Sequence, residues 1–126
     1  MTQQENDLLL KDLCGRLPYG VKVEYENEVF DVEYVCPMYE EVKFDILETW
    51  TIDVLDIKPY LFPLSSMTDA EKEEYCQLQQ RVIYNSKGPV NEDVTKYINW
   101  CYKKHLDINN LIPIGLAIDA TGLDVY

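Results

Sequence analysis

The sequence predicts a single α+β domain over residues 1–126, and three patterns carry that prediction. The first residues form an apolar stripe with helical spacing, the next run alternates apolar and charged residues as strands do, and helical spacing returns after two prolines. With 126 residues, 47% of them hydrophobic, the chain is long enough for one core. We therefore expect an N-terminal helix, an antiparallel β-meander of three to four strands, two C-terminal helices that cover one sheet face, and an ordered tail. A small barrel of curled strands is the alternative.

The first helix is expected over residues 5–17, where leucines recur at four-residue spacing, and it ends near Pro18. Residues 21–25 and 30–34 then alternate with period two, as paired strands do. An even loop around Asn27 and Glu28 places all of their apolar side chains on one face. That register predicts five facing pairs: Tyr25 with Phe30, Glu24 with Asp31, Val23 with Val32, Lys22 with Glu33, and Val21 with Tyr34.

Two further strands complete the expected meander. Their apolar positions alternate, and they are Val42, Phe44 and Ile46 in the third strand and Trp50, Ile52 and Val54 in the fourth. The segment "KPYLFPLSS", residues 58–66, then contains Pro59 and Pro63, which cannot both lie inside a helix or a central strand. We expect an irregular connector there.

The hydroxyl residues at the end of this connector and just after it could serve either in catalysis or in helix capping. Thr68 followed by Glu71 forms a T-x-x-E capping box, in which each side chain accepts a hydrogen bond from the other residue's backbone amide. A catalytic role for Ser65 or Ser66 would require a neighbouring base, and no G-x-S-x-G turn is present. The pattern therefore predicts the start of the second helix rather than an active site.

The third helix is the clearest element, because one continuous apolar face runs through "NEDVTKYINWCYKKHLD", residues 91–107. Acidic residues occupy its first turn, and basic residues with His105 occupy its last, which complements the helix dipole. His105, the only histidine, is interpreted as a residue at the helix end near the core rather than as a catalytic base. The apolar tail, residues 109–126, is expected to dock on the domain.

The cysteines give no indication of a metal site. Cys14, Cys36, Cys76 and Cys101 lie more than twenty residues apart, whereas structural zinc sites draw on close pairs. Cys14, Cys76 and Cys101 fall in apolar helical patterns, where cysteine acts as a small hydrophobe. We therefore expect reduced cysteines, a cytoplasmic location, and neither a metal nor a cofactor.

Charge and motif patterns argue against several function classes. The net charge of −12 repels phosphate backbones and disfavours direct nucleic-acid binding. No signal peptide pattern or apolar stretch of spanning length occurs, so no membrane association is expected. No phosphate-binding glycine loop is present, and one histidine cannot form H-E-x-x-H. We therefore expect no catalytic residues and no enzyme activity.

Three segments carry a resemblance to a known group of sequences: "LLLKDLCGRLPYGVKV", "IKPYLFPLSSMTDAEKEEY" and "GLAIDATGLDVY". The chain resembles a family of small uncharacterised proteins encoded in gut Bacteroidales genomes and in their phages and mobile elements. The residues from about 24 to 51 look like the variable part. No catalytic motif accompanies the family, and the resemblance implies an accessory protein that binds a host factor.

Acidic residues are concentrated in the expected β-region. Residues 24–56 contain eleven acidic residues and one lysine, which is ten of the twelve net negative charges. These side chains either solvate the outer sheet face or form a recognition surface for a basic protein partner. We predict such binding by an interaction protein; a structural or oligomeric accessory subunit and a small enzyme of unrecognised type are the alternatives. The predicted partner-binding residues are Glu24, Glu26, Asp31, Glu33 and Asp45.

Overall fold

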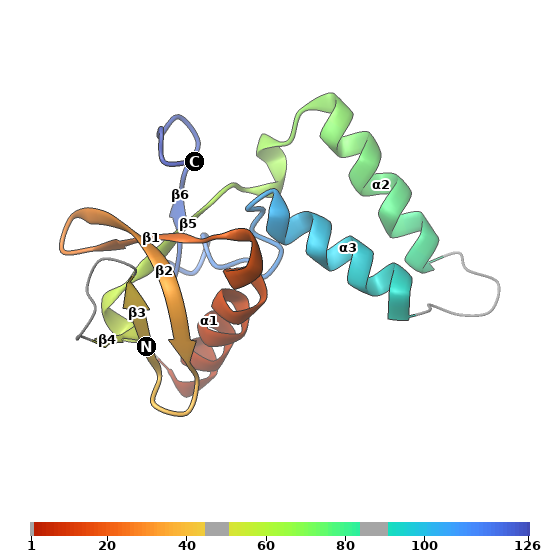
Figure 1. Ribbon diagram of the computed structural model, residues 1–126. Coiled ribbons are helices and arrows are strands. Elements are labelled where there is room, and N and C mark those ends of the chain that lie inside the picture. Colours follow the sequence, from red (N-terminus) through yellow and green to blue (C-terminus); the bar gives the residue numbers. More distant parts are fainter. Residues whose placement is uncertain (1, 45–50, 84–90) are drawn as a thin grey trace.

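The computed structural model describes residues 2–44, 51–83 and 91–126 (Figure 1). Within these residues the chain has the predicted α+β fold. Its helices are α1 (Gln3–Arg16), α2 (Asp69–Ile83) and α3 (Asn91–Lys103). Its strands are β1 (Lys22–Tyr25), β2 (Glu28–Cys36), β3 (Glu41–Phe44), β4 (Ile52–Asp53), β5 (Lys58–Leu61) and β6 (Ile118–Asp119). Short 3₁₀ helices cover Leu17–Tyr19, Val54–Asp56 and Leu64–Ser66.

The six strands form one mixed sheet in the order β4-β3-β2-β1-β5-β6. The first four strands are the predicted antiparallel meander, in which each strand pairs with the next one along the chain. β5 then pairs antiparallel with β1 on the other side, and β6 pairs parallel with β5. The meander thus lies on one side of the sheet, and later segments extend it on the other.

The turn between β1 and β2 lies one residue earlier than predicted. Tyr25 faces Glu28 rather than Phe30, so Glu26 and Asn27 are the two turn residues. Both have positive φ, 50° and 65°. This is the conformation that a type I′ hairpin turn requires, because its twist matches that of the flanking strands.

The shifted turn moves the register by two residues and leaves the faces unchanged, because side chains alternate with period two. Lys22 therefore faces Asp31 rather than Glu33, and Glu24 faces Val29 rather than Asp31. The predicted repulsive pair of carboxylates was wrong. In its place an opposite-charge pair supports the hairpin.

A β-bulge in β2 explains why Tyr34 does not point inward as predicted. Val32 pairs with Phe44, but Val35, three residues later, pairs with Val42. The extra residue reverses the alternation, so Val35 is buried while Tyr34 is 51% exposed. Simple alternation along the sequence cannot locate such a bulge. The predicted third strand is confirmed at Val42 and Phe44, whereas Ile46 and Trp50 lie outside the described residues.

The predicted irregular connector is wrong for residues 58–61, which form β5 between β1 and β6. Pro59 is buried opposite Val23. A single proline removes only one ladder donor, and Pro63 lies beyond the strand, so a four-residue strand tolerates the sequence. Tyr60 and Leu61 pair with β6, which the sequence did not reveal.

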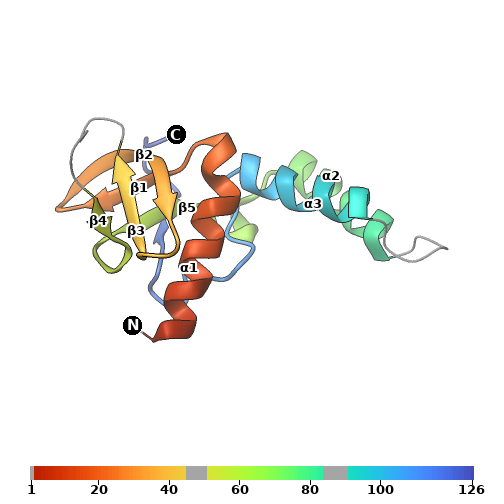
Figure 2. The ribbon, with the colours of Figure 1, turned by 60° about the horizontal axis from the view of Figure 1, so that its bottom comes forward.

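The core lies between the sheet and α1, with Leu9, Leu10 and Leu13 of the helix buried against strand residues. Figures 1 and 2 show α2 and α3 packed side by side and directed away from the sheet. The sheet is therefore covered by α1 rather than by the two later helices. No residue of α2 is buried, because its apolar stripe is too narrow to pack on more than one neighbour.

The end of α3 joins this helical arm to the rest of the molecule. Tyr102 is buried against Gly15 of α1, where an added Cβ would lie 2.4 Å from its ring. The following segment is ordered, as predicted. It buries Leu111 and Leu116, forms β6 and continues to Tyr126. The tail therefore contributes both to the core and to the sheet.

Candidate functional site

The exposed side of the β1–β2 hairpin carries most of the predicted partner-binding residues. Glu26 lies at its tip together with Glu28, which was not among the predicted residues, and Glu33 is the extra residue of the bulge. All three side chains are exposed, and none forms an ion pair within the described part of the chain. We call these three residues the hairpin acids.

Two other predicted residues face lysines instead of solvent alone. Lys22 Nζ lies 2.9 Å from Asp31 Oδ1, with both side chains partly exposed. Glu24 is half-buried and stands opposite Lys58 of β5. These lysines reduce the negative charge at the centre of the sheet. Asp45, the fifth predicted residue, lies outside the described residues.

Two apolar side chains accompany the acids on the outward side of β2. Val29 is 46% exposed and Tyr34 is 51% exposed, while Phe30, Val32 and Val35 turn inward. Apolar side chains scattered singly are common on protein surfaces. Here, however, they share one strand with the exposed carboxylates of Asp31 and Glu33. The outward side of β2 thus combines apolar and acidic groups.

Carboxylates also gather around the tip of the hairpin. Desolvation raises the pKa of Tyr25, and the neighbouring carboxylates of Glu26 and Asp56 raise it further. The Tyr25 hydroxyl therefore stays protonated and neutral at physiological pH. The effect of Asp56 on Tyr25 shows that this residue, which ends the 3₁₀ helix after β4, lies near the acidic hairpin tip although it is distant in the sequence.

The hydroxyl residues after β5 form the predicted capping box. Thr68 N donates to Glu71 Oε1 at 2.9 Å, and Glu71 N donates to Thr68 Oγ1 at 3.2 Å. Ser66 Oγ donates to the Pro63 carbonyl at 2.7 Å and so closes a 3₁₀ turn. These hydrogen bonds start α2 and leave Ser66 in a local structural role.

His105 lies just beyond α3, as predicted. Its ring stacks on Tyr126 with centroids 3.7 Å apart, and its Nδ1 atom is buried without a hydrogen-bond partner among the described residues. Burial and the positive charges of Arg16 and Lys22 lower the pKa of His105 to about 4. The imidazole is therefore neutral at pH 7, and its visible role is to pack against an aromatic ring.

The cysteines are all free, but their environments differ from the prediction. Cys101 is buried, and burial raises the pKa of its thiol to about 11. Cys14 and Cys76 are exposed, so they do not pack within an apolar helical face as predicted. Within the described ranges, no three His, Cys, Asp or Glu side chains converge as metal ligands.

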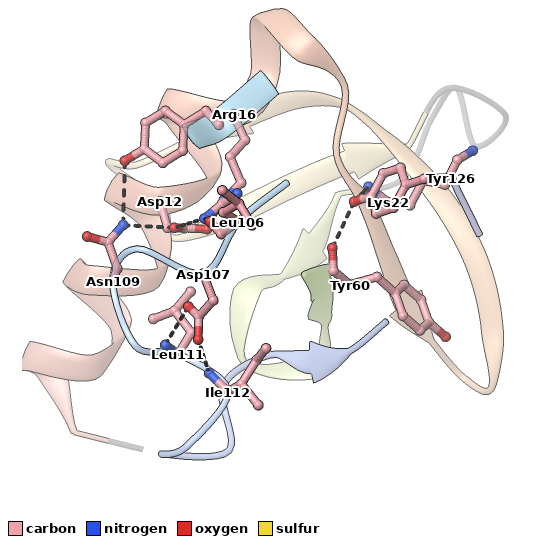
Figure 3. A network of polar contacts seen from close by, with 11 residues as sticks. Asp12, Arg16, Lys22, Tyr60, Leu106, Asp107, Asn109, Leu111, Ile112 and Tyr126 are labelled. Atoms are coloured by element: carbon pink, nitrogen blue, oxygen red, sulfur yellow. Dashed lines mark hydrogen bonds and ion pairs between the residues drawn. The ribbon is translucent and has the colours of Figure 1, made fainter. Parts of the chain in front are cut away.

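The sequence did not predict the buried polar network between α1 and the loop after α3 (Figure 3). Arg16 and Asp12 form a fully buried ion pair, with Nε to Oδ2 at 2.7 Å and Nη2 to Oδ1 at 3.0 Å. Arg16 also donates to the Leu106 carbonyl at 2.6 Å, and Asn109 donates to Asp12 at 2.8 Å. Asp107 accepts from two backbone amides of the following loop.

The sequence offered one indication of this network: Asp12 and Arg16 are four residues apart, a spacing that allows an ion pair within a helix. On its own, however, that spacing is typical of surface pairs. The network fastens α1 to the loop after α3. Its full burial and its contacts between α1 and the loop after α3 indicate a structural role, although Arg16 Nη1 has no hydrogen-bond partner among the described residues.

Comparison with known proteins gives no match to any protein family, to any curated protein or to any solved structure. Across the described residues, no helix is both long enough and apolar enough to cross a membrane.

Proposed function

We propose that this chain is a non-enzymatic interaction protein that binds a basic protein surface through the outward side of the β1–β2 hairpin. One observation carries the proposal: half-exposed Val29 and Tyr34 lie beside acids that lack a cationic partner in the described chain. Protein interfaces typically combine a small apolar centre with a charged rim. Tyr34 is the expected anchor, and the hairpin acids are the expected rim.

The negative charge of this chain indicates that the surface of the proposed partner is basic. The net charge of −12 attracts a basic surface at long range and accelerates encounter. Glu26, Glu28 and Glu33 would then pair with lysine or arginine side chains of the partner. Asp31 and Glu24 contribute less in this view, because Lys22 and Lys58 already stand opposite them. Asp45 remains a proposed contact.

The resemblance to small proteins of gut Bacteroidales genomes, phages and mobile elements supplies a context for this proposal. In that context the chain would act as an accessory protein that engages a basic host factor. A structural or oligomeric subunit is the second candidate. It is favoured by the turn after β2, where Met38 is 82% and Tyr39 69% exposed.

The test removes the hairpin acids without changing the fold. The triple variant Glu26→Gln, Glu28→Gln, Glu33→Gln is compared with a control that removes three charges elsewhere: Glu73→Gln, Glu92→Gln and Asp124→Asn. A basic partner is first identified by capture from host lysate at low salt, and its affinity for each purified variant is then measured. We expect the hairpin variant to bind at least about tenfold more weakly, because three charged pairs are lost.

Salt sensitivity and self-association separate the two candidates. Binding through exposed charges should weaken between about 0.05 M and about 0.5 M salt, since the Debye length shortens over this range. Equal affinity of the hairpin and control variants would contradict the proposal. Self-association that Met38→Ser and Tyr39→Ser abolish, and that the hairpin variant retains, would favour the structural subunit.

A further inference from the structure

The side chain of Tyr126 lies between two strands of the sheet (Figure 3). Its hydroxyl accepts from the Lys22 backbone N–H at 3.0 Å and donates to the Tyr60 carbonyl at 2.9 Å. Val23 of β1 faces Pro59 of β5, so Lys22 and Tyr60 are the next facing positions. One hydroxyl therefore bridges the strands where their direct pairing stops, and it satisfies one donor and one acceptor.

Aromatic groups hold the ring of the same tyrosine. His105 stacks on it with an interplanar angle of 15°, and Phe62 contacts it at a tilted angle of 51° with centroids 6.0 Å apart. Burial raises the pKa of Tyr126 to about 12, so the hydroxyl keeps the proton that it donates. We call the Lys22 N–H, the Tyr60 carbonyl and the rings of Phe62 and His105 the tyrosine slot.

The walls of the slot are held by contacts that do not involve Tyr126. Phe62 N donates to the His105 carbonyl at 2.8 Å, and Asp107 N donates to the Phe62 carbonyl at 2.8 Å. These bonds fix the two aromatic walls relative to each other. Pairing between β1 and β5 fixes the two backbone groups. The slot is therefore preorganised, which favours binding because little ordering remains to be done.

The segment that delivers Tyr126 is held much less firmly. Ala120 is buried, but residues 121–124 are exposed, and they turn back through two short-range hydrogen bonds, from Thr121 N to Asp119 Oδ1 and from Leu123 N to the Ala120 carbonyl. Leu123 is 47% exposed, and Tyr126 itself is 39% exposed. The slot thus opens to solvent on one side, where the ring of Tyr126 is partly exposed.

We propose that the tyrosine slot is a binding site for a phenol group, which Tyr126 fills within the chain and which an external phenol fills when Tyr126 is absent. A phenol fits because it supplies a flat ring that can stack on His105 beside Phe62 and a hydroxyl that both accepts and donates. A benzene ring leaves the Lys22 N–H and the Tyr60 carbonyl unpaired. Discrimination between the two ligands follows from that cost.

The test empties the slot and offers ligands from solution. Tyr126→Ala should melt at a lower temperature than the unaltered protein. Near-saturating 4-methylphenol should raise its melting temperature by about 4 °C or more, because a ligand that binds only the folded state stabilises it. Toluene should raise it much less, and the unaltered protein should respond to neither ligand.

Each of the remaining results would also support or contradict the phenol site. No rise with 4-methylphenol, or an equal rise with toluene, would overturn the proposal. If Tyr126→Ala is unfolded by itself, folding on addition of 4-methylphenol supports the site, and failure to fold overturns it. N-acetyltyrosinamide provides a separate arm: rescue by this compound indicates that the slot also admits a peptide tyrosine, whereas rescue by 4-methylphenol alone restricts it to small phenols.

Discussion

The sheet with α1 and the arm formed by α2 and α3 are stabilised in different ways. The first region buries side chains completely, including Leu9, Phe44 and the ion pair of Asp12 with Arg16. In α2 no residue is buried, and the arm is joined by contacts such as Tyr75 Oη to Tyr97 Oη at 3.0 Å and Trp100 Nε1 to Glu74 Oε2 at 2.7 Å.

This difference predicts two levels of stability within one chain. Full burial and a buried ion pair resist opening, whereas a two-helix arm with half-exposed contacts opens at lower free-energy cost. The arm should therefore exchange its amide protons faster than β1 and β2. Changes in the sheet region should unfold the whole molecule, while changes in the arm should act locally.

The largest expected effect comes from breaking the buried ion pair. Arg16→Met leaves the Asp12 carboxylate buried with Asn109 as its one remaining side-chain partner among the described residues. We expect a loss of about 3–5 kcal/mol in unfolding free energy, measured by denaturant titration, because an unpaired buried charge is costly. The double variant Asp12→Leu, Arg16→Met should recover much of this loss. An Arg16→Met protein as stable as the original would show that the network contributes little.

The next effect concerns the junction between the two regions. Gly15→Ala places a methyl group 2.4 Å from the Tyr102 ring, so the ring or the helix must move. We expect a loss of about 1–3 kcal/mol, despite the better helix propensity of alanine. Adding Tyr102→Leu to Gly15→Ala should make the alanine substitution less costly than it is alone. A stabilised Gly15→Ala protein would contradict this packing argument.

A pH effect of intermediate size should arise at His105. Its pKa is about 4 in the folded state, below the ordinary value of 6.5, so the unfolded chain binds the proton more readily between these values. The stability contribution is complete above about pH 6.5 and is lost as the pH falls toward 4. His105→Gln should flatten the dependence of unfolding free energy on pH in this window. An unchanged slope would place the acid sensitivity elsewhere.

The smallest expected effect lies in the arm. Thr68→Ala removes the hydroxyl that accepts from Glu71 N, and it should cost about 1 kcal/mol in the stability of α2. Hydrogen exchange should speed up in α2 and stay unchanged in β1 and β2. Ser65→Ala serves as the matched control, since this side chain is exposed and the capping box consists of Thr68 and Glu71. Equal acceleration in the sheet would mean that the two regions unfold together.

The elements that the sequence predicted correctly depend on residues that are close together in the sequence. The capping box of Thr68 and Glu71 spans four residues, and helical or alternating patterns span fewer than twenty. The β1–β2 register was displaced by two because the turn uses Glu26, although positive φ is uncommon for glutamate. Because the displacement is an even number of residues, the predicted buried and outward faces of these strands up to the bulge remained correct.

The features that the sequence could not reveal depend on distant partners. Arg16 binds the Leu106 carbonyl 90 residues away, and Tyr126 binds Lys22 across 104 residues. β5 was missed because its neighbours β1 and β6 come from opposite ends of the chain. Of the five predicted partner-binding residues, the structure leaves Glu26 and Glu33 exposed without a cation in the described part and brings lysines opposite Asp31 and Glu24.

The two outermost strands limit how another chain can approach the sheet. β4 and β6 contain two residues each, Ile52–Asp53 and Ile118–Asp119, and each ends in an aspartate. Adding a foreign strand requires a longer row of free backbone groups than either edge offers. The sheet is thereby protected against edge-to-edge aggregation. At these two described edges, recognition would therefore rest on side-chain shape and charge rather than on backbone pairing.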